Sequence, residues 1–262
     1  MTGPAPKADP RAVLGRHLPW LVPGAITVLA AGWDSDAYAL DGRIVVKLPK
    51  NAPAELRLRR EAALLAVVRP AVTLPVPDLH LVSGPPLFSW HRMLPGQQLL
   101  AGGYAGLAAD AQVRLAQDLG RFLAELHRID LAQARAVGAV DLVPWRGATQ
   151  VLALAMPVLP AALQPQAARL VADYAALPPD PLGLVYGHFD SHGWNMAFDL
   201  KRQVLNGIYD FADSGIGPRH HEFIYTGLIS FALERIALNL IQIEGNPRQA
   251  CRWLYGVSPS IR

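Results

Sequence analysis

The sequence predicts an α+β protein with two lobes, a small antiparallel sheet followed by a larger and mainly helical part. Three observations support this prediction. Short apolar runs separated by turn residues fill the first third of the chain, Leu94-Pro95-Gly96 interrupts that pattern, and stretches with helical periodicity follow. We therefore expect an N-terminal lobe over residues 1–94 and a C-terminal lobe over residues 95–262, with a binding cleft between them.

The composition is that of a folded protein, with 52% hydrophobic and 17% charged residues among 262. Residues 1–94 hold 11 Lys/Arg and 7 Asp/Glu, whereas residues 95–262 hold 13 and 14. The basic surplus of the first part suits a nucleotide triphosphate and is too small for a nucleic-acid-binding surface. Cys251 is the only cysteine, which excludes an internal disulfide and indicates a reducing, cytoplasmic setting.

One apolar segment, residues 18–31, has some features of a secretory signal because basic residues precede it. Pro19 and Pro23 interrupt it, and it is too short to span a bilayer. We interpret residues 25–31 instead as a buried strand, and we expect no association with a membrane.

The first lobe alternates between strand patterns and turn signals. Asp41-Gly42 is a strong signal for a two-residue hairpin turn, and Pro49 and Pro53 end the strands that follow it. Residues 55–68 have a helical composition. The predicted strands cover residues 26–29, 37–40 and 44–48, and the segment 73–94 supplies two more.

The second lobe contains the clearest helix of the chain, residues 110–128, in which Leu115, Leu119 and Leu126 recur with a period of 3.6. Asp110 stands where a helix N-cap is expected. Further helices are predicted over residues 165–176, 222–240 and 247–255.

Two segments of the second lobe carry the strongest chemical signal. LVYGHFDSHGWNMAFD begins at Leu184, and GIYDFADSGIG begins at Gly207. The first places Asp190 five residues before Asn195, and the second places Asp210 after a short apolar strand. A hard cation such as Mg²⁺ needs oxygen ligands, and a separate carboxylate must face the hydroxyl that attacks a phosphate. The spacing therefore predicts Asp190 as the base and Asn195 and Asp210 as metal ligands.

Two neighbours of these residues have less certain roles. His188 belongs to the same catalytic loop, where we expect it to brace the backbone by hydrogen bonds. Asp213 either supports the metal ligands from outside or binds the metal itself, and the sequence leaves both open.

The first lobe supplies residues that suit the phosphates. Lys47 lies in the predicted strand RIVVKLP, and Glu61 lies in the helix after it. A lysine on an inner strand can reach the α- and β-phosphates, and a helix glutamate can hold its amino group. The turn at residues 32–36 lacks a G-x-G-x-x-G pattern, but Gly32 and Ser35 are candidates for capping a phosphate. A plain hairpin turn is the alternative there.

A competing interpretation uses His188, Asp190 and His192 as ligands of zinc or iron in a metal-dependent hydrolase. It leaves Lys47 and Asn195 without a role. A second alternative is a nucleotide-binding regulatory protein without turnover.

The two segments resemble the aminoglycoside phosphotransferase and choline kinase group of small-molecule kinases, which share the protein-kinase-like fold. GHFDSHGWN is similar to the catalytic loop of that family, and GIYDFADSGIG is similar to its metal-binding segment. The resemblance implies Mg²⁺-dependent transfer of the γ-phosphate of ATP or GTP to a hydroxyl or amine of a small acceptor. It also implies that backbone groups of Arg92, Met93 and Leu94 hold the purine.

The chain departs from the family pattern near the acceptor. Phe189 replaces the usual glycine, and Pro218-Arg219-His220-His221 replaces the usual Asp-Pro. From residue 214 to the end there are three acidic residues and five arginines. Because a positively charged pocket repels a polycation, we expect aminoglycosides to be poor acceptors. The sequence does not decide between ATP and GTP, nor the oligomeric state.

Overall fold

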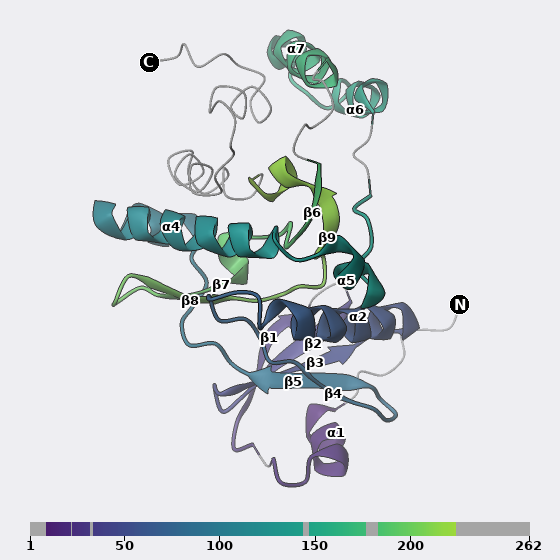
Figure 1. Cartoon of the computed structure of the whole chain (residues 1–262), viewed down its shortest axis with the longest axis vertical. Helices are drawn as coiled ribbons and strands as arrows, with labels where there is room; N and C mark the ends of the chain where they lie inside the picture. The colour runs from purple at the N-terminus through teal and green to yellow at the C-terminus, as the bar shows by residue number, and fades with distance from the viewer. Residues whose placement is uncertain (1–8, 22, 32–33, 144–146, 177–182, 224–262) are drawn as a thin grey trace.

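The computed structural model describes residues 9–21, 23–31, 34–143, 147–176 and 183–223. Its N-terminal part is a five-stranded antiparallel sheet with the strand order β1-β2-β3-β5-β4 (Figure 1). The predicted sheet of the first third is therefore confirmed. The strands are β1 (Ile26–Ala31), β2 (Ser35–Leu40), β3 (Ile44–Pro49), β4 (His80–Val82) and β5 (Phe88–Arg92).

The turn between β2 and β3 forms a hairpin, as predicted. Asp41 and Gly42 have φ values of 49° and 62°, the left-handed conformation that suits a tight hairpin turn, and the amide of Arg43 donates to the Leu40 carbonyl at 2.9 Å. The first paired residues are Leu40 and Ile44, so the turn is one residue longer than the two-residue turn that the sequence predicts. Lys47 lies opposite Ser89 of β5 in the same sheet.

The prediction of a buried first strand is wrong. β1 is an edge strand, and its Val28 and Leu29 are 63% and 44% exposed. An apolar run cannot by itself reveal burial, because burial depends on which elements cover the strand.

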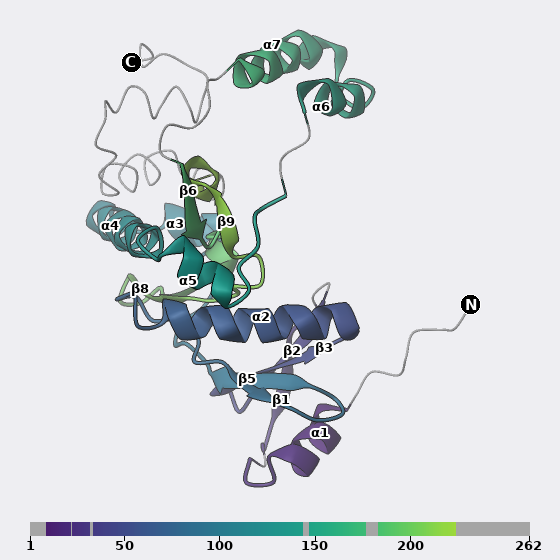
Figure 2. The same cartoon turned by 45° about the vertical axis from the view of Figure 1, so that its right-hand side comes forward.

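Two helices cover opposite faces of the sheet (Figure 2). α1 (Pro10–His17) packs Val13 and Leu14 on the outer face, in a cluster that includes Val46 and Phe88. α2 (Ala52–Val68) covers the inner face. Its N-cap is Asn51, whose side chain accepts a hydrogen bond from the amide of Ala54, so the helix begins before Pro53, not after it.

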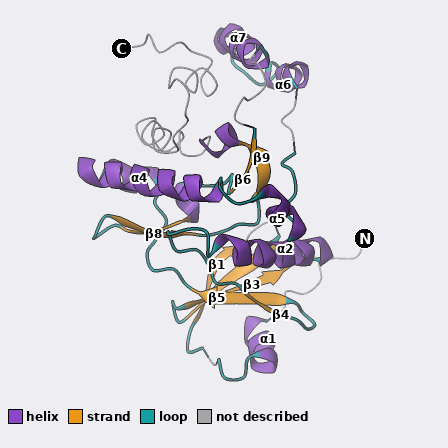
Figure 3. Ribbon diagram, in the orientation of Figure 1, coloured by secondary structure: helices purple, strands orange, loops and turns teal. Residues whose placement is uncertain are grey.

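The part that follows β5 is mainly helical in the described residues (Figure 3). Its longest helix, α4, packs on one side of two small antiparallel strand pairs, β6 with β9 and β7 with β8. The helices are α3 (Ala101–Ala105), α4 (Ala109–Leu126), α5 (Leu131–Ala136), α6 (Ala148–Ala155) and α7 (Gln164–Ala175), and the strands are β6 (Leu184–Gly187), β7 (Met196–Asp199), β8 (Val204–Ile208) and β9 (Gly215–Pro218).

The helices predicted at residues 110–128 and 165–176 are confirmed as α4 and α7. Asp110 is not the N-cap of α4, however. Ala108 holds that position, and Asp110 lies in the first turn, where it pairs with Arg114 one turn later. The helices predicted at residues 222–240 and 247–255 fall outside the described residues, apart from Glu222, which ends a 3-10 turn (Arg219–Glu222), and Phe223, which follows it.

The largest core joins the two parts. Leu64 and Leu65 of α2 belong to one buried cluster with Phe122 of α4 and Phe198 of β7. The lobe boundary predicted at Leu94 remains a proposal, supported by the end of β5 at Arg92. None of the helices in the described part of the chain has the length and hydrophobicity that a membrane span requires.

Candidate active site

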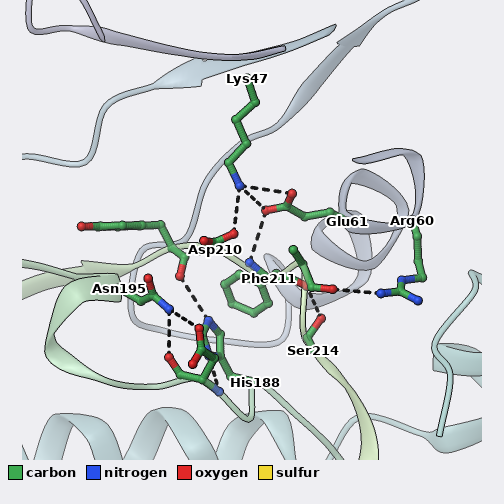
Figure 4. Close-up of polar contacts among 11 residues, drawn as sticks. Lys47, Arg60, Glu61, His188, Asn195, Asp210, Phe211 and Ser214 are labelled. Atoms are coloured by element: carbon green, nitrogen blue, oxygen red, sulfur yellow. Dashed lines mark hydrogen bonds and ion pairs between the residues drawn. The ribbon is translucent and has the colours of Figure 1, made fainter. Parts of the chain in front are cut away.

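The strand that carries Lys47 explains where its side chain points. Val46 and Leu48 lie in the core of the outer face, and neighbouring residues of a strand point to opposite faces. Lys47 therefore faces α2. Its Nζ atom donates to Glu61 Oε1 at 3.0 Å and contacts Asp210 Oδ1, also at 3.0 Å (Figure 4). A strand, the helix after it and a segment far along the chain thus meet at one amino group.

The charges of this group stabilise one another. Burial alone would lower the pKa of Lys47, but the carboxylates of Glu61 and Asp210 outweigh it, so the pKa is raised and the amine stays protonated. Burial likewise works against ionised Asp210, yet Lys47 holds the pKa of that carboxyl below its usual value. At neutral pH the site contains one cation between two carboxylates.

α2 also holds the backbone next to Asp210. The amide of Phe211 donates to Glu61 Oε1 at 3.2 Å, and Arg60 Nη2 donates to the carbonyl of Ala212 at 2.9 Å. Asp210 itself has a φ of 66°, which is uncommon for a residue with a side chain. The helix therefore fixes both the lysine and the segment that presents Asp210.

The second half of the site is the loop between β6 and β7. Asn195 Nδ2 donates to Asp190 Oδ2 at 2.7 Å and to the Asp190 carbonyl at 2.9 Å. Because the nitrogen of the amide is used in this way, its oxygen Oδ1 remains for a cation. Burial raises the pKa of Asp190, and the neighbouring His192 acts against that rise. A raised pKa brings a carboxylate closer to accepting a proton at neutral pH.

His188 is fully buried and braces this loop, as the sequence predicts. Its Nε2 lies 3.2 Å from the carbonyl of Tyr209, and its Nδ1 accepts the amide of Asp190 at 3.2 Å. A carbonyl only accepts and an amide N–H only donates, so Nε2 donates to Tyr209 and Nδ1 accepts from Asp190. The ring also meets Phe211 edge to face. Both ring nitrogens of His188 are therefore engaged within the protein.

The residues present fit a hard cation. Asn195 offers an amide oxygen and Asp210 a carboxylate, from two segments that Lys47, His188 and Asp190 hold together. Oxygen ligands of this kind, completed by phosphate oxygens and water, are those that Mg²⁺ prefers.

The zinc or iron site considered above is not formed. Among the described residues, no group of three or more His, Cys, Asp or Glu side chains is arranged to hold a metal ion. Both nitrogens of His188 are already engaged.

A buried glutamate holds the backbone of the loop between β6 and β7. The sequence patterns assign this residue no role in the loop. Glu222 is fully buried, and its two carboxylate oxygens accept the amides of His188 at 2.7 Å and Phe189 at 2.9 Å. Phe189 has a φ of 58°, so a bulky side chain stands here on a left-handed backbone. His127 approaches Glu222 Oε1 to 3.7 Å. Only the fold could reveal this anchor, since 32 or more residues separate Glu222 from its partners.

The structure supports some of the remaining predicted site residues less than others. Gly32 falls outside the described residues. Ser35 is the first residue of β2 and lies opposite Pro49. The prediction that places it in the turn at residues 32–36 is therefore wrong. Asp213 is exposed, and its charge adds to the rise in the pKa of Asp190 that burial chiefly causes. No hydrogen bond places Asp213 among the described metal ligands.

The connection after β5 is already partly hydrogen-bonded. The amide of Met93 donates to the Arg43 carbonyl at 2.7 Å, and His91 Nδ1 donates to the Arg92 carbonyl at 2.9 Å. Burial lowers the pKa of His91 to about 4, so its ring is neutral. Leu94 packs over Gly207 of β8, where an added Cβ would lie 2.8 Å from Leu94 Cδ1. These contacts restrict which backbone groups remain for a purine.

A model of the phosphotransferase enzyme family matches residues 25–254. The chain belongs to this family. The match includes both lobes and every site residue named above, so the predicted resemblance to aminoglycoside phosphotransferases and choline kinases is confirmed, and the protein is a phosphotransferase. No curated protein sequence matches the chain.

Solved structures confirm the fold of this phosphotransferase. The GDP complex of wild-type aminoglycoside 2'-phosphotransferase-IIIa has a TM-score of 0.77 at 22% identity, covering 93% of this chain and 85% of that one. The apoenzyme of a macrolide 2'-phosphotransferase from Brachybacterium faecium has a TM-score of 0.68, with the same identity and the same coverage of both chains. The streptomycin–ATP–APH(2")-IIa ternary complex has a TM-score of 0.67 at 19% identity, covering 95% and 86%.

Proposed function

We propose that this phosphotransferase transfers the γ-phosphate of ATP or GTP, with Mg²⁺, to a hydroxyl or amine of a small molecule. The observation that supports this most strongly is the meeting of Lys47, Asp210, Asn195 and Asp190 from distant segments in one site. Each of the four side chains is held by another residue, so the arrangement does not need the substrate to form.

The residues of the site would divide the reaction between them. Lys47, oriented by Glu61, binds the α- and β-phosphates, and Asn195 and Asp210 hold Mg²⁺, which neutralises charge on the transferred phosphate. The acceptor oxygen forms a bond to the γ-phosphorus while the bond to the β–γ bridging oxygen breaks. Asp190 orients the acceptor and takes its proton, and the nucleoside diphosphate leaves.

The purine would lie beside the connection after β5. We propose that the groups of Arg92, Met93 and Leu94 still free contact it, with Gly32 and Ser35 closer to the phosphates. Solved relatives were obtained with GDP or with ATP, so both donors stay within the proposal.

The acceptor is proposed to be neutral or anionic. Arg219, His220 and His221 follow directly after β9, and residues 214–262 contain more arginines than acids. The similar solved structures include an aminoglycoside 2'-phosphotransferase and a macrolide 2'-phosphotransferase, so structural likeness alone does not identify the acceptor. A specificity constant for kanamycin at or above about 10⁴ M⁻¹s⁻¹ would contradict this part of the proposal.

The decisive experiment measures ADP and GDP release with Mg²⁺ across aminoglycosides, macrolides, amino alcohols, sugars and nucleosides. Asp190→Asn, which keeps the size of the side chain, should lower acceptor-stimulated kcat by about 10³-fold. Asp78→Asn, at an exposed position in the first lobe, is the matched control. Nucleotide binding without turnover on any acceptor would favour a regulatory protein, and no nucleotide binding at all would overturn the proposal. The lone Cys251 supports a reducing compartment such as the cytoplasm as its proposed location.

A further inference from the structure

One polar side chain of the catalytic loop has no role in the proposed reaction. His192 Nε2 lies 3.3 Å from Asp190 Oδ1, the oxygen that Asn195 does not hold. The two side chains are 28% and 21% exposed, so the contact is partly shielded from water. The carboxylate of Asp190 therefore has a polar partner at each of its oxygens.

The backbone keeps His192 in this place independently of its side chain. The amide of His192 donates to the Asp190 carbonyl at 2.8 Å, and its carbonyl accepts the amide of Asn195 at 2.9 Å. Trp194, whose ring meets the His192 ring nearly at right angles, borders the imidazole on one side. A change of the His192 side chain thus leaves these loop hydrogen bonds available.

The neighbouring loop packs tightly enough to limit movement. An added Cβ on Gly193 would lie 1.8 Å from the carbonyl oxygen of Leu99, and the amide of Leu99 donates to the Gly193 carbonyl at 2.9 Å. The carbonyl of Trp194 accepts from Gln98 and from the hydroxyl of Tyr209. His192 is therefore presented from a rigid turn, which a positioning group requires.

A carboxylate held at one oxygen can still rotate about its last side-chain bond. Contacts at both oxygens fix its plane, and this decides from which direction a hydroxyl can approach. The contact at Oδ2 comes from Asn195, a proposed metal ligand. The contact at Oδ1 comes from His192.

We propose that His192 is a positioning residue that fixes the plane of the Asp190 carboxylate toward the acceptor, while Asn195 ties the same carboxylate to the metal site. This inference rests on the proposed function, because it assigns His192 to the acceptor side of that reaction. It requires a side chain that can donate to Asp190 Oδ1, and it leaves the nucleotide contacts of Lys47 untouched.

Two variants of similar size separate donation from packing. His192→Leu removes the donor, and His192→Gln places an amide nitrogen at a similar reach to Nε2. We expect His192→Leu to lower kcat by roughly 100-fold with the nucleotide KM changed less than about twofold. His192→Gln should recover about tenfold of that loss. His80→Leu, on β4 and stacked on Trp90, is the histidine control and should keep the activity of the wild type.

A crystal structure of each variant gives a readout that does not need turnover. In His192→Leu the Asp190 carboxylate should rotate or occupy two positions, and in His192→Gln it should keep its place. Equal kcat in the Leu variant and the wild type, no recovery in the Gln variant, or an unmoved Asp190 in the Leu variant would each overturn the inference. If the wild type shows no Asp190-dependent turnover, the proposed function fails, and the position of Asp190 in the Leu variant then decides the inference alone.

Discussion

Lys47 is held by the charges of two side chains, whereas the loop that carries Asp190 is held mainly through its backbone. The amino group of Lys47 lies between Glu61 and Asp210. The same charged groups would contact the phosphates and the metal. In the Asp190 loop, the anchor is Glu222, which is fully buried and accepts two backbone amides. Substitutions of the residues around Lys47 should therefore mainly affect activity, and substitutions of the loop anchor Glu222 should mainly affect stability.

The largest effect is expected from Glu222→Ala. It leaves the buried amides of His188 and Phe189 without their acceptor, and it should lower the free energy of unfolding by about 3 kcal/mol or more. Urea unfolding measures this change. Glu222→Gln, which keeps one carbonyl oxygen, should lose less. If the Ala and Gln variants are as stable as the wild type, the loop is held in some other way.

Glu61→Gln should affect activity more than stability. Its amide oxygen can still accept from Lys47 or Phe211, so we expect a loss of only about 1 kcal/mol in the free energy of unfolding. The loss of charge beside Lys47 should lower kcat/KM by roughly tenfold or more. Glu55→Gln in the first turn of the same helix is the control, with a change within about 0.5 kcal/mol. Equal activity in the variant and the wild type would break the comparison.

Substitutions at Phe189 test the backbone of the loop directly. Removing the buried ring destabilises the protein in either case, but the φ of 58° favours glycine over alanine. Phe189→Gly should therefore be more stable than Phe189→Ala by about 1 kcal/mol, the opposite of the order in a helix. Thermal or urea unfolding of both variants decides this, and a more stable Ala variant would count against the left-handed conformation.

The smallest expected effects are changes of stability with pH, and they have opposite signs for the two aspartates. The pKa of Asp210 is lowered, so its charge stabilises the fold above the ordinary carboxyl pKa, and this contribution is lost as the pH falls through the lowered value. The pKa of Asp190 is raised, so its charge destabilises the fold once the pH rises through that value.

Unfolding measured at about pH 7 and about pH 3 should therefore separate the two variants. At neutral pH, Asp210→Asn should be less stable than the wild type and Asp190→Asn more stable, and both differences should shrink in acid. Stability differences of the same sign at neutral pH would contradict the assignment of the two environments.

Much of the site could be predicted because residue types at short sequence spacing indicate its chemistry. The distance in sequence from Asp190 to Asn195 fits one loop, and Lys47 lies in a strand whose alternation points it away from the outer core. The hairpin at Asp41-Gly42 followed from backbone geometry alone. These are short-range properties, and short-range patterns are read well from a sequence.

The errors share a different origin. The apolar pattern predicts a buried strand over residues 25–31 and places the cap of α4 at Asp110, yet both depend on neighbours that the local pattern does not contain. The turn signals place Ser35 in a loop, because the sequence does not show that β2 extends to meet Pro49. Burial, caps and strand ends are decided when elements pack together.

The sequence by itself determined which residues could carry phosphoryl transfer, because residue type and spacing limit the chemistry of a loop. Only the tertiary structure decided that Glu222 anchors that loop, and that His192 meets the oxygen of Asp190 that Asn195 does not hold. The reason is physical: a hydrogen bond depends on distance and direction in space, and residues far apart in the chain acquire these only in the folded protein.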